Sequence, residues 1–487
     1  MALSNAQVLS QIPQAYKRTS AEIAAGVTPT NYAYSAPNPL RYGSDPTGTN
    51  DSTTAIQNAI NVAAKMGGYI VDLGPGTFKV TGLTISSTGV ILKGAGCSGY
   101  EYTNNESLPS YPTQLLYSGT SGGIVVNVES LNLTTTPTIH GVGVQGMYIN
   151  GNALAATGLA VQGVRDSNFS DVHVDGVTTQ AFLLNALSQT GSVDSTNVQY
   201  CTFSHLTWML LQTASQSAHG IVLTTADLPA NTDSDVAFCI FRQCNGECYN
   251  GICYVLAAAD NNSFFGCTAT RRGPGTTNAG LSIRGADENL FWDFSVYGVH
   301  GIEILGTASG YLANPYANVF FCTDVQNGTQ YPTLDANVSC QYHNSANGWF
   351  TLRAINVSGQ KVIDAFSERG ATEAGSDVSL IRNPGSTANA VQEGANLTLG
   401  DAAAGTNSCL QHSGGQTEIW QYNGGVWKQI IWWDTGGTMH LPGGTTGTQG
   451  ATFSASNKPG STSQTSPAIW LPIYLNGAQY YIPAFSA

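Results

Sequence analysis

Three carboxylates in the middle of the chain stand outside any repeated pattern and could act in acid–base chemistry. They are Glu247, Asp293 and Glu303. Hydrolysis of a glycosidic bond ordinarily needs two carboxyl groups, about 5 to 5.5 Å apart for retention of configuration and about 6.5 to 9.5 Å apart for inversion. Two of these three residues are therefore candidates for the acid and the base or nucleophile of a glycoside hydrolase.

The sequence around each carboxylate predicts its setting. Glu303 lies between Ile302 and Ile304, so strand alternation points it away from the core if the isoleucines face inward. The preceding coil has Ser282 at the place equivalent to Glu303. Asp293 interrupts an aromatic run at a place where the preceding coil has Gly266, and Glu247 lies in a turn close to the start of a strand. Each of the three is also compatible with a solvated surface acid, so the chemistry depends on what lies beside it.

A second set of residues fits a polysaccharide lyase instead. A lyase needs a base such as His or Tyr beside a group, commonly Arg, that neutralises the carboxylate of a uronic acid. The adjacent cations Arg271 and Arg272 suit an anionic sugar, although a solvated turn explains them equally well. The predicted substrate-binding residues are Arg271, Arg272, Arg284, Tyr297, His300 and Trp292.

A repeat of short strands must position these residues. A turn that carries Asn or Asp, followed by an apolar or aromatic strand, recurs at steps of 27 to 29 residues, with one step of 38. Several short strands and no helix in each period predict a parallel β-solenoid, in which every coil hides its apolar face on the next. The long step predicts an insertion between residues 197 and 235. The third residues of the turns are Asn168, Asn197, Asp235, Asn262, Asn289 and Asn318.

Four acids belong to these turns. Asp233, Asp260 and Asp287 recur 27 residues apart, and Asp235 lies beside the first of them. Recurrence indicates a structural role, because Asx side chains accept hydrogen bonds from the turn backbone. A bridging cation or a catalytic pair is the alternative interpretation.

Helical and β-rich segments flank the repeat. Residues 4–25 are predicted to form short helices broken at Pro13, and a helix is predicted to follow a cap at 51–53 and to stop at Gly67. An Asn-Gly turn at Asn423 predicts a β-hairpin over 418–428. The expected domains are an N-terminal attachment segment and linker (1–38), a cap with one helix (39–100), the β-helix (101–355), a C-terminal β-rich domain (356–450), and a linker with a terminal segment (451–487).

Composition limits the partners. With 17 basic and 30 acidic residues the net charge is −13, which disfavours nucleic acid and anionic membrane surfaces. We expect no membrane insertion and no secretory signal, because no long apolar run is present. The ten cysteines lack zinc-site spacing, so we expect buried free thiols, no metal and no cofactor.

The low content of charged residues also fits a solenoid. Charged residues make up 10% of the 487-residue chain, against about 25% in an average soluble protein. Equivalent residues of stacked coils lie about 4.8 Å apart, so like charges repeated at one position would repel each other. An isolated acid such as Glu303 or Asp293 is therefore more conspicuous here than in an ordinary sequence.

The segment before the repeat carries a motif known from other proteins. It resembles the N-terminal cap of the pectate-lyase-like right-handed β-helix family and, more particularly, that of bacteriophage tailspike depolymerases. The resemblance extends over roughly residues 39 to 350, the coil region by period and pattern only. The motif comprises Arg41-Tyr42-Gly43, Asp45, Gly48, Asp51-Ser52-Thr53, Ala55-Ile56, Ala59-Ile60 and Gly76-Thr77-Phe78.

This resemblance implies an all-β fold: a right-handed parallel β-helix with a short helical N-terminal segment and a C-terminal β-rich domain. It implies a homotrimer on a virion tail, made in the bacterial cytoplasm, joined to other tail proteins through its N-terminal segment and acting outside the cell. Its expected ligand is a bacterial surface polysaccharide. Scaffolds of this kind carry hydrolases, lyases and non-enzymatic receptor-binding spikes, so the function has to be argued from the site.

Overall fold

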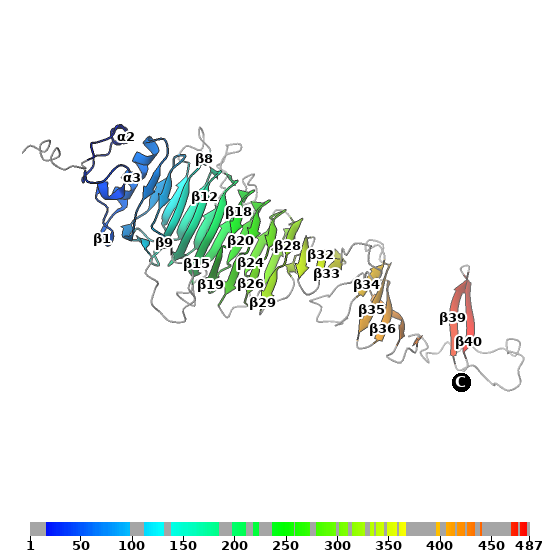
Figure 1. Ribbon diagram of the computed structural model, residues 1–487. Coiled ribbons are helices and arrows are strands. Elements are labelled where there is room, and N and C mark those ends of the chain that lie inside the picture. Colours follow the sequence, from blue (N-terminus) through cyan, green and yellow to red (C-terminus); the bar gives the residue numbers. More distant parts are fainter. Residues whose placement is uncertain are drawn as a thin grey trace, which may run out of the picture. The chain divides into compact units, whose positions relative to one another are not determined.

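Stacked coils of short strands dominate the computed structural model (Figure 1). The chain divides into two compact units, residues 1–377 and 378–487. The structure describes residues 16–97, 112–130, 138–184, 197–210, 218–223, 236–257, 259–272, 279–298, 301–309, 314–326, 332–335, 338–344, 348–357, 360–366, 396–399, 406–413, 416–423, 426–433, 439–440, 469–475 and 478–484.

The N-terminal cap and the segment before it contain most of the described helical residues. They hold α2 (Ser20–Ala24), the 3-10 helix η1 (Pro39–Tyr42) and α3 (Thr53–Lys65), and a short 3-10 helix η2 (Thr307–Ser309) lies among the last coils. The buried face of α3 includes Ile56, Ala59 and Ile60, as its spacing predicts, and Gly67 follows its end with a φ of 86°. The predicted helix after residues 51–53 is thus confirmed. Of the helices predicted over 4–25, the structure describes α2, while residues 1–15 lie outside the described part.

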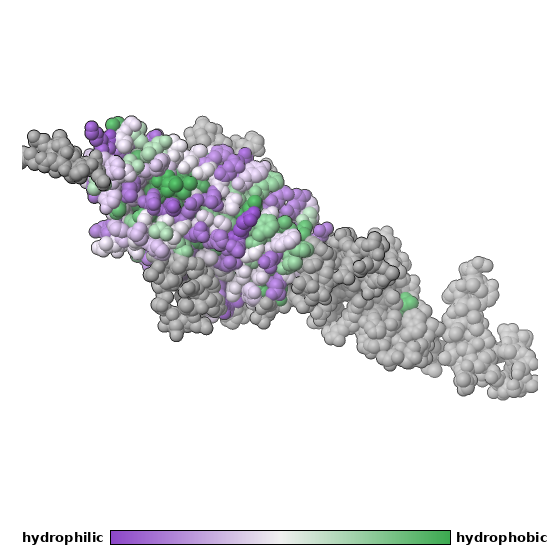
Figure 2. Space-filling view, viewed as in Figure 1, coloured by the Kyte–Doolittle hydropathy of each residue, from purple (hydrophilic) through white to green (hydrophobic). Residues whose placement is uncertain are grey.

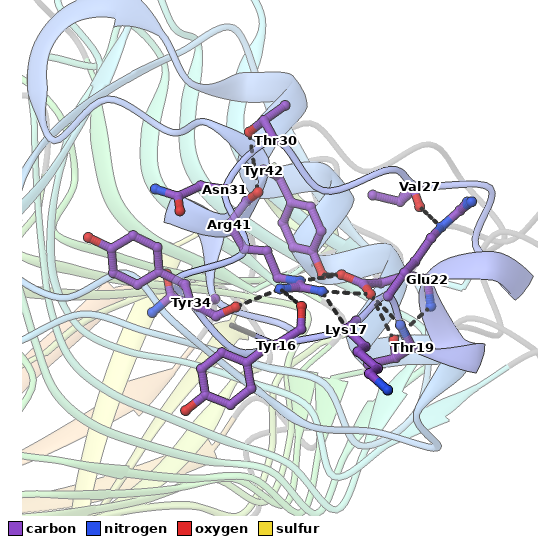
Figure 3. A network of polar contacts seen from close by, with 12 residues as sticks. Tyr16, Lys17, Thr19, Glu22, Val27, Thr30, Asn31, Tyr34, Arg41 and Tyr42 are labelled. Atoms are coloured by element: carbon purple, nitrogen blue, oxygen red, sulfur yellow. Dashed lines mark hydrogen bonds and ion pairs between the residues drawn. The ribbon is translucent and has the colours of Figure 1, made fainter. Parts of the chain in front are cut away.

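A buried ion pair joins the segment before the cap to the cap itself. The guanidinium of Arg41 donates to both carboxylate oxygens of Glu22, from Nη2 at 3.1 Å and from Nε, and Tyr42 donates its hydroxyl to the same carboxylate at 3.0 Å (Figure 3). Arg41 also donates to the backbone carbonyls of Lys17 and Tyr34 at 3.0 and 2.7 Å. Residues 16–34 are therefore packed onto the cap by a charge pair that water does not reach.

Three sheets of parallel strands form the coils. The first sheet contains β1 (Thr47–Asp51), β2 (Ile70–Asp72), β3 (Gly76–Val80), β5 (Ile91–Lys93), β6 (Thr113–Tyr117), β9 (Gly143–Asn150), β12 (Asn168–Asp175), β15 (Thr202–Leu210), β18 (Ile240–Arg242), β19 (Asn245–Cys248), β22 (Ser263–Phe265), β23 (Thr268–Arg271), β25 (Leu290–Trp292), β26 (Ser295–Tyr297), β28 (Asn318–Phe321), β29 (Asp324–Gln326) and β31 (Ser339–Asn344). Antiparallel β32 (Gly348–Val357) and β33 (Gln360–Phe366) extend it.

The other two sheets complete each turn of the chain. The second contains β4 (Leu83–Ile85), β7 (Ile124–Glu129), β10 (Thr157–Gln162), β13 (Gln180–Leu184), β16 (His219–Leu223), β20 (Tyr254–Ala257), β24 (Leu281–Arg284), β27 (Ile302–Leu305) and β30 (Thr333–Leu334). The third contains β8 (Ile139–His140), β11 (Val164–Arg165), β14 (Val198–Gln199), β17 (Val236–Ala237) and β21 (Ala259–Asp260). This confirms the right-handed parallel β-helix predicted from the sequence.

Stacked rings fill the interior of the coils. Six phenylalanines occupy one inward position, and consecutive rings lie nearly parallel with centroids 4.5 to 5.1 Å apart. All six are fully buried, so each coil buries apolar area mainly against its neighbours. The residues are Phe169, Phe203, Phe241, Phe264, Phe291 and Phe320.

Strand register corrects part of the predicted repeat. Asn262, Asn289 and Asn318 are equivalent, as predicted, and Asn262 donates to Asn289 and Asn289 to Asn318. The register of the third sheet shows that the equivalents in earlier coils are Cys239, Cys201 and Ser167, so the assignments to Asp235, Asn197 and Asn168 are wrong. Thiols replace amides there: Cys239 and Cys201 donate to backbone carbonyls two residues earlier at 3.4 and 3.3 Å.

The second unit is antiparallel. Its sheet contains β34 (Asn396–Leu399), β35 (Thr406–Ser413), β36 (Gln416–Asn423), β37 (Val426–Trp433) and β38 (Met439–His440), and a separate hairpin pairs β39 (Ile469–Leu475) with β40 (Ala478–Ala484). Pairing of β36 with β37 confirms the hairpin predicted at Asn423. No helix in the described part of the chain is long and apolar enough to cross a membrane.

Candidate functional site

A groove runs along the first sheet where each coil bends. It is an open depression of about 430 Å³. The face of the molecule in Figure 2 mixes hydrophilic and neutral residues with a few apolar patches where it is coloured. Register places the lining residues of the groove one above another on successive coils, because Ser204 pairs with Arg242, Arg242 with Phe265, and Phe265 with Trp292. The lining comprises Ser204, His205, Arg242, Gln243, Phe265, Gly266, Trp292 and Asp293.

The bend itself is made by residues in the left-handed conformation. His205, Gln243, Gly266 and Asp293 have φ values of 51° to 59° and follow one another along the coil axis. Glycine, asparagine and aspartate adopt this conformation most easily, whereas a bulkier residue is uncommon there. Asp293 occupies the position that Gly266 has in the preceding coil, as predicted. Gly266 makes the same bend without a side chain, so the carboxyl group of Asp293 is not needed to form the bend.

Aromatic rings give the groove a stacking surface. Trp292 is 46% exposed and its ring centroid lies 4.0 Å from that of Phe321 on the next coil. On the other side of Trp292, the guanidinium of Arg242 lies 5.6 Å from the centre of the Phe265 ring. An exposed indole held by a neighbouring ring, with a cation and a carboxylate close by, is suited to a flat ligand that also carries hydroxyl groups.

The polar side chains of the groove differ in how they are held. His205 shares a hydrogen bond of 2.6 Å with Gln243 and lies 3.6 Å from the carboxylate of Asp171. No residue in the described part of the chain gives the side chain of Asp293 a hydrogen bond or an ion pair. The Asp293 carboxylate is therefore an available proton acceptor beside an exposed tryptophan.

Glu247 lies in a different setting from the predicted turn. It belongs to strand β19, where it pairs in register with Met209 and Thr270, and its side chain is only 4% exposed. Arg272 donates two hydrogen bonds to its carboxylate, from Nε at 3.1 Å and from Nη2 at 2.9 Å. The turn prediction is wrong because the strand begins at Asn245, and the carboxylate is already engaged by a cation.

Glu303 points outward from the second sheet. Ile302 and Ile304 are buried, Glu303 between them is half-buried, and it pairs in register with Ser282, all as predicted. Its carboxylate lies 4.0 Å from Nη2 of Arg284. The structure therefore places Glu303 on a different sheet from Asp293.

The predicted residues do not gather at one point. Asp293 lies at the bend of the first sheet, Glu247 on a strand two coils earlier, and Glu303 on the second sheet. Trp292 joins Asp293 in the groove. Tyr297, half-buried on β26, pairs with Thr270. His300 lies outside the described residues, and Arg271 is buried at the end of β23.

The repeated turn acids act on the backbone of the following coil. Asp260 accepts a hydrogen bond from the backbone N–H of Asp287 at 2.8 Å, and Asp287 accepts one from that of Tyr316 at 2.9 Å. Burial raises the pKa of Asp287 to about 6, and the charges of Asp260 and Glu288 add to this shift. These contacts are those expected of structural turn residues. Asp233 and Asp235 lie outside the described residues.

Sequence reasoning missed six of the eight lining residues of the groove, namely Ser204, His205, Arg242, Gln243, Phe265 and Gly266. Phe265 could have been found, since it lies 27 residues before Trp292, at the spacing of the repeat. Arg242 and His205 come from coils whose lengths depart from that spacing. Within the described residues, no group of three or more His, Cys, Asp or Glu side chains is arranged to hold a metal ion.

Comparison with known proteins finds solved structures that are similar to this chain at low sequence identity. No family model matches the chain, and no curated protein matches it. ORF18 of Geobacillus virus E2 is similar over 92% of this chain and 86% of its own, at 14% identity and a TM-score of 0.47. A tailspike protein of Acinetobacter baumannii bacteriophage Fri1, a capsular polysaccharide depolymerase, is similar over 62% of this chain and 57% of its own, at 13% identity and a TM-score of 0.36. An iota-carrageenase from A. fortis is similar over 57% and 62%, at 14% identity and a TM-score of 0.36.

Proposed function

We propose that this protein is a phage tailspike that binds a bacterial surface polysaccharide in the groove of the first sheet and depolymerises it by endo-glycosidic hydrolysis. The observation that carries the proposal is the exposed ring of Trp292 beside the unengaged carboxylate of Asp293. Pyranose rings stack on exposed indoles, and carboxylates bond sugar hydroxyls or exchange protons with a glycosidic oxygen. The remainder of the proposal, a homotrimer mounted on a virion tail, rests on the resemblance of the cap motif.

In this mechanism Asp293 is one of the two carboxyl groups. Trp292 holds a sugar ring against the bend, and Asp293 exchanges a proton at the scissile bond or with the attacking water. Glu303 lies on another sheet and Glu247 lies two coils earlier with both of its oxygens bonded to Arg272, so neither is placed to pair with Asp293 within one chain. The second carboxyl group in this proposal would come from a neighbouring subunit of the proposed trimer.

A lyase is the second candidate, and one observation favours it. Arg242 and His205 lie on adjacent coils of the same groove. Arg242 would neutralise the carboxylate of a uronic acid, and His205 would remove the proton beside it. Gln243 and Asp171 orient the imidazole of His205, which a base of this kind requires.

The deciding experiment follows polysaccharide length and ultraviolet absorbance together. The purified full-length protein is incubated with capsule or lipopolysaccharide from candidate hosts, and its assembly is measured by light scattering. Shortening without the absorbance of an unsaturated uronate supports hydrolysis, and shortening with it supports the lyase. Binding with no shortening refutes both enzymes and leaves a receptor-binding spike.

Variants then assign the carboxylates. Asp293→Asn keeps a residue that tolerates the left-handed bend, and it should lower cleavage at least a hundredfold while binding persists. Glu288→Gln is the matched control, because Glu288 has the same φ of 54° at another bend. The Glu288→Gln variant should cleave the polysaccharide normally. If Glu303→Gln abolishes cleavage and Asp293→Asn does not, the active site lies on the second sheet and the groove assignment is wrong.

A further inference from the structure

Two exposed aromatic rings stack on each other at a second bend of the coils, where strands of the third sheet lead into strands of the first. Tyr200 is 55% exposed and Phe238 is 46% exposed, and their rings are nearly parallel, with centroids 5.2 Å apart. The register of Gln199 with Ala237, the residues just before them, places the two rings one above the other on adjacent coils. This ring pair is not part of the lining of the groove.

The bend itself does not require a ring. Tyr200 and Phe238 have φ values of 55° and 56°, a left-handed conformation that is uncommon for a bulky residue. At the equivalent bends of the coils before and after them, Asp166 and Asn261 have φ values of 50° and 57°, and these residue types adopt the conformation more easily. Residues held in sparsely populated conformations often mark functional sites. Because the rings are also exposed, neither the bend nor the packing of the core explains them.

The ring pair lies along the opposite edge of the strip of the first sheet that borders the groove. Phe238 precedes the three-residue strand β18, and Gln243 of the groove follows it. Tyr200 and His205 have the same relation on the preceding coil. Trp292 lies two coils beyond Phe238 and four residues further along the strand, so the two are no more than about 16 Å apart, at about 3.3 Å per residue and about 4.8 Å per coil. One extended ligand can therefore reach both edges.

The exposed area and its neighbours fit a sugar better than another protein chain. An aromatic side chain offers about 150 to 250 Å², so two half-exposed rings present roughly 200 Å², whereas a specific protein interface buries about 800 Å² on each partner. The neighbours of the rings along the row are polar: Asp166, whose carboxylate lies 3.1 Å from Nδ1 of His140, and the amide of Asn261. Apolar ring faces beside groups that bond hydroxyls suit a pyranose ring.

We propose that Tyr200 and Phe238 form a second stacking subsite, which binds another sugar of the same polysaccharide that Trp292 binds in the groove. This inference rests on the function proposed above. Two contacts with one polymer reinforce each other, because the first keeps the second part of the ligand at a high effective concentration. The ring pair therefore holds a long chain at the groove between successive cleavages.

Hydroxyl-radical footprinting of the full-length protein tests the subsite directly. The probe is the capsule or lipopolysaccharide that the wild type binds. Without it, Tyr200 and Phe238 should be oxidised readily, and with it their oxidation should fall together with that of Trp292, while exposed Tyr69 on the cap should be unaffected. Slow oxidation of the ring pair without polysaccharide would show that another subunit covers it, and would overturn the proposal. Protection of Trp292 alone would also overturn it, and would leave the proposed function intact.

Variants measure the contribution of the rings. Phe238→Asn introduces the residue that makes this bend in the following coil, and it should weaken binding of the polysaccharide about three- to tenfold in calorimetric titration. Tyr69→Asn, which removes an exposed ring from the cap, is the matched control and should bind as wild type does. Equal affinity for the two variants would overturn the proposal. A change in assembled mass for Phe238→Asn in light scattering would show an interface between copies of the chain and would overturn it as well.

Discussion

The side chain of Asn262 donates from Nδ2 to Oδ1 of Asn289, one coil further along, at 3.1 Å, and both residues are fully buried. Asn289 in turn donates to Asn318 at 3.1 Å and to the carbonyl of Ala259 at 2.7 Å. Each amide therefore uses its donors and its acceptor within a row that runs along the coils. Such a row is stable only when complete, because a buried group left without a partner retains its full desolvation cost.

Replacement of the central amide should destabilise the protein strongly. Asn289→Ala removes the acceptor of Asn262 and the donor to Ala259, and we expect a loss of about 2 to 4 kcal/mol in the free energy of unfolding. Chemical denaturation monitored by circular dichroism measures it. Asn61→Ala, on the exposed face of α3, is the control and should change stability little. A loss below about 0.5 kcal/mol for Asn289→Ala would contradict a cooperative row.

The Glu22–Arg41 pair should make the N-terminal segment sensitive to acid. Burial alone would raise the pKa of Glu22, but hydrogen bonds from Arg41, Thr19 and Tyr42 outweigh it and the pKa lies below the ordinary 4.5. The stabilisation is therefore present above about pH 4.5 and is lost as the pH falls through the lowered pKa.

Glu22→Gln tests this dependence. The variant should be less stable than wild type at neutral pH, by about 3 to 5 kcal/mol for a broken buried pair. Its stability should also change less than that of wild type between pH 5 and pH 3. Hydrogen exchange of residues 16–34 is the measurement, with Glu129→Gln as control. Equal exchange in wild type and Glu22→Gln at neutral pH would show that the pair does not hold this segment.

Asp287 should show the opposite dependence on pH. Its carboxyl has a pKa raised to about 6 by burial, against 3.8 ordinarily, so between about pH 4 and 6 the folded state holds a proton that the unfolded state has released. Stability should fall as the pH rises through this window and level off above it. Asp287→Asn keeps an acceptor for the N–H of Tyr316 and should be more stable than wild type at pH 7 but not at pH 4. The test is the unfolding midpoint measured as a function of pH, with Asp72→Asn at an exposed position as the control. The same difference in midpoint between Asp287→Asn and wild type at pH 7 and at pH 4 would rule out the raised pKa.

Trp292 should be the main binding residue of the groove. Trp292→Ala removes the exposed ring that packs at an angle against Phe321, and we expect affinity for the polysaccharide to fall about tenfold, or about 1.4 kcal/mol, with the fold unchanged. Calorimetric titration with an oligosaccharide of the cognate polymer measures it. Tyr69→Ala, which removes another exposed ring from the cap, is the control. Equal affinity for both variants would place binding elsewhere on the molecule.

The local sequence pattern was enough to predict the direction and the equivalents of a residue wherever its surroundings repeat from coil to coil. The outward direction of Glu303 follows from alternation between two isoleucines, and the equivalence of Asp293 with Gly266 follows from the 27-residue period. The equivalence of Glu303 with Ser282, 21 residues earlier, follows from the similar strand patterns Leu281-Ser282-Ile283 and Ile302-Glu303-Ile304. The helix α3 follows likewise from its spacing. These features depend on neighbours along one strand, one helix or one regular repeat, which the sequence displays directly.

Where neighbouring coils differ in their number of residues, only the tertiary structure shows which residues are equivalent. Equivalent residues are 38 positions apart from Cys201 to Cys239 but only 23 apart from Cys239 to Asn262, so no single period aligns them. His205 and Arg242 enter the groove through that irregular part. Their place in it is set by stacking of the coils and not by their spacing.

The amino-acid sequence by itself determined the β-helix, its cap and the isolated acids. Each coil must present similar inward apolar residues to the next coil, so the apolar pattern recurs along the sequence and an acid outside that pattern can be recognised. Only the tertiary structure decided which charges are engaged. Arg271 and Arg272 are adjacent and chemically identical, yet alternation along β23 turns Arg271 inward, with Nε and Nη1 unbonded, and leaves Arg272 on Glu247, 25 residues away. Partnership between side chains on different coils is fixed by packing across the stack, which no local pattern contains.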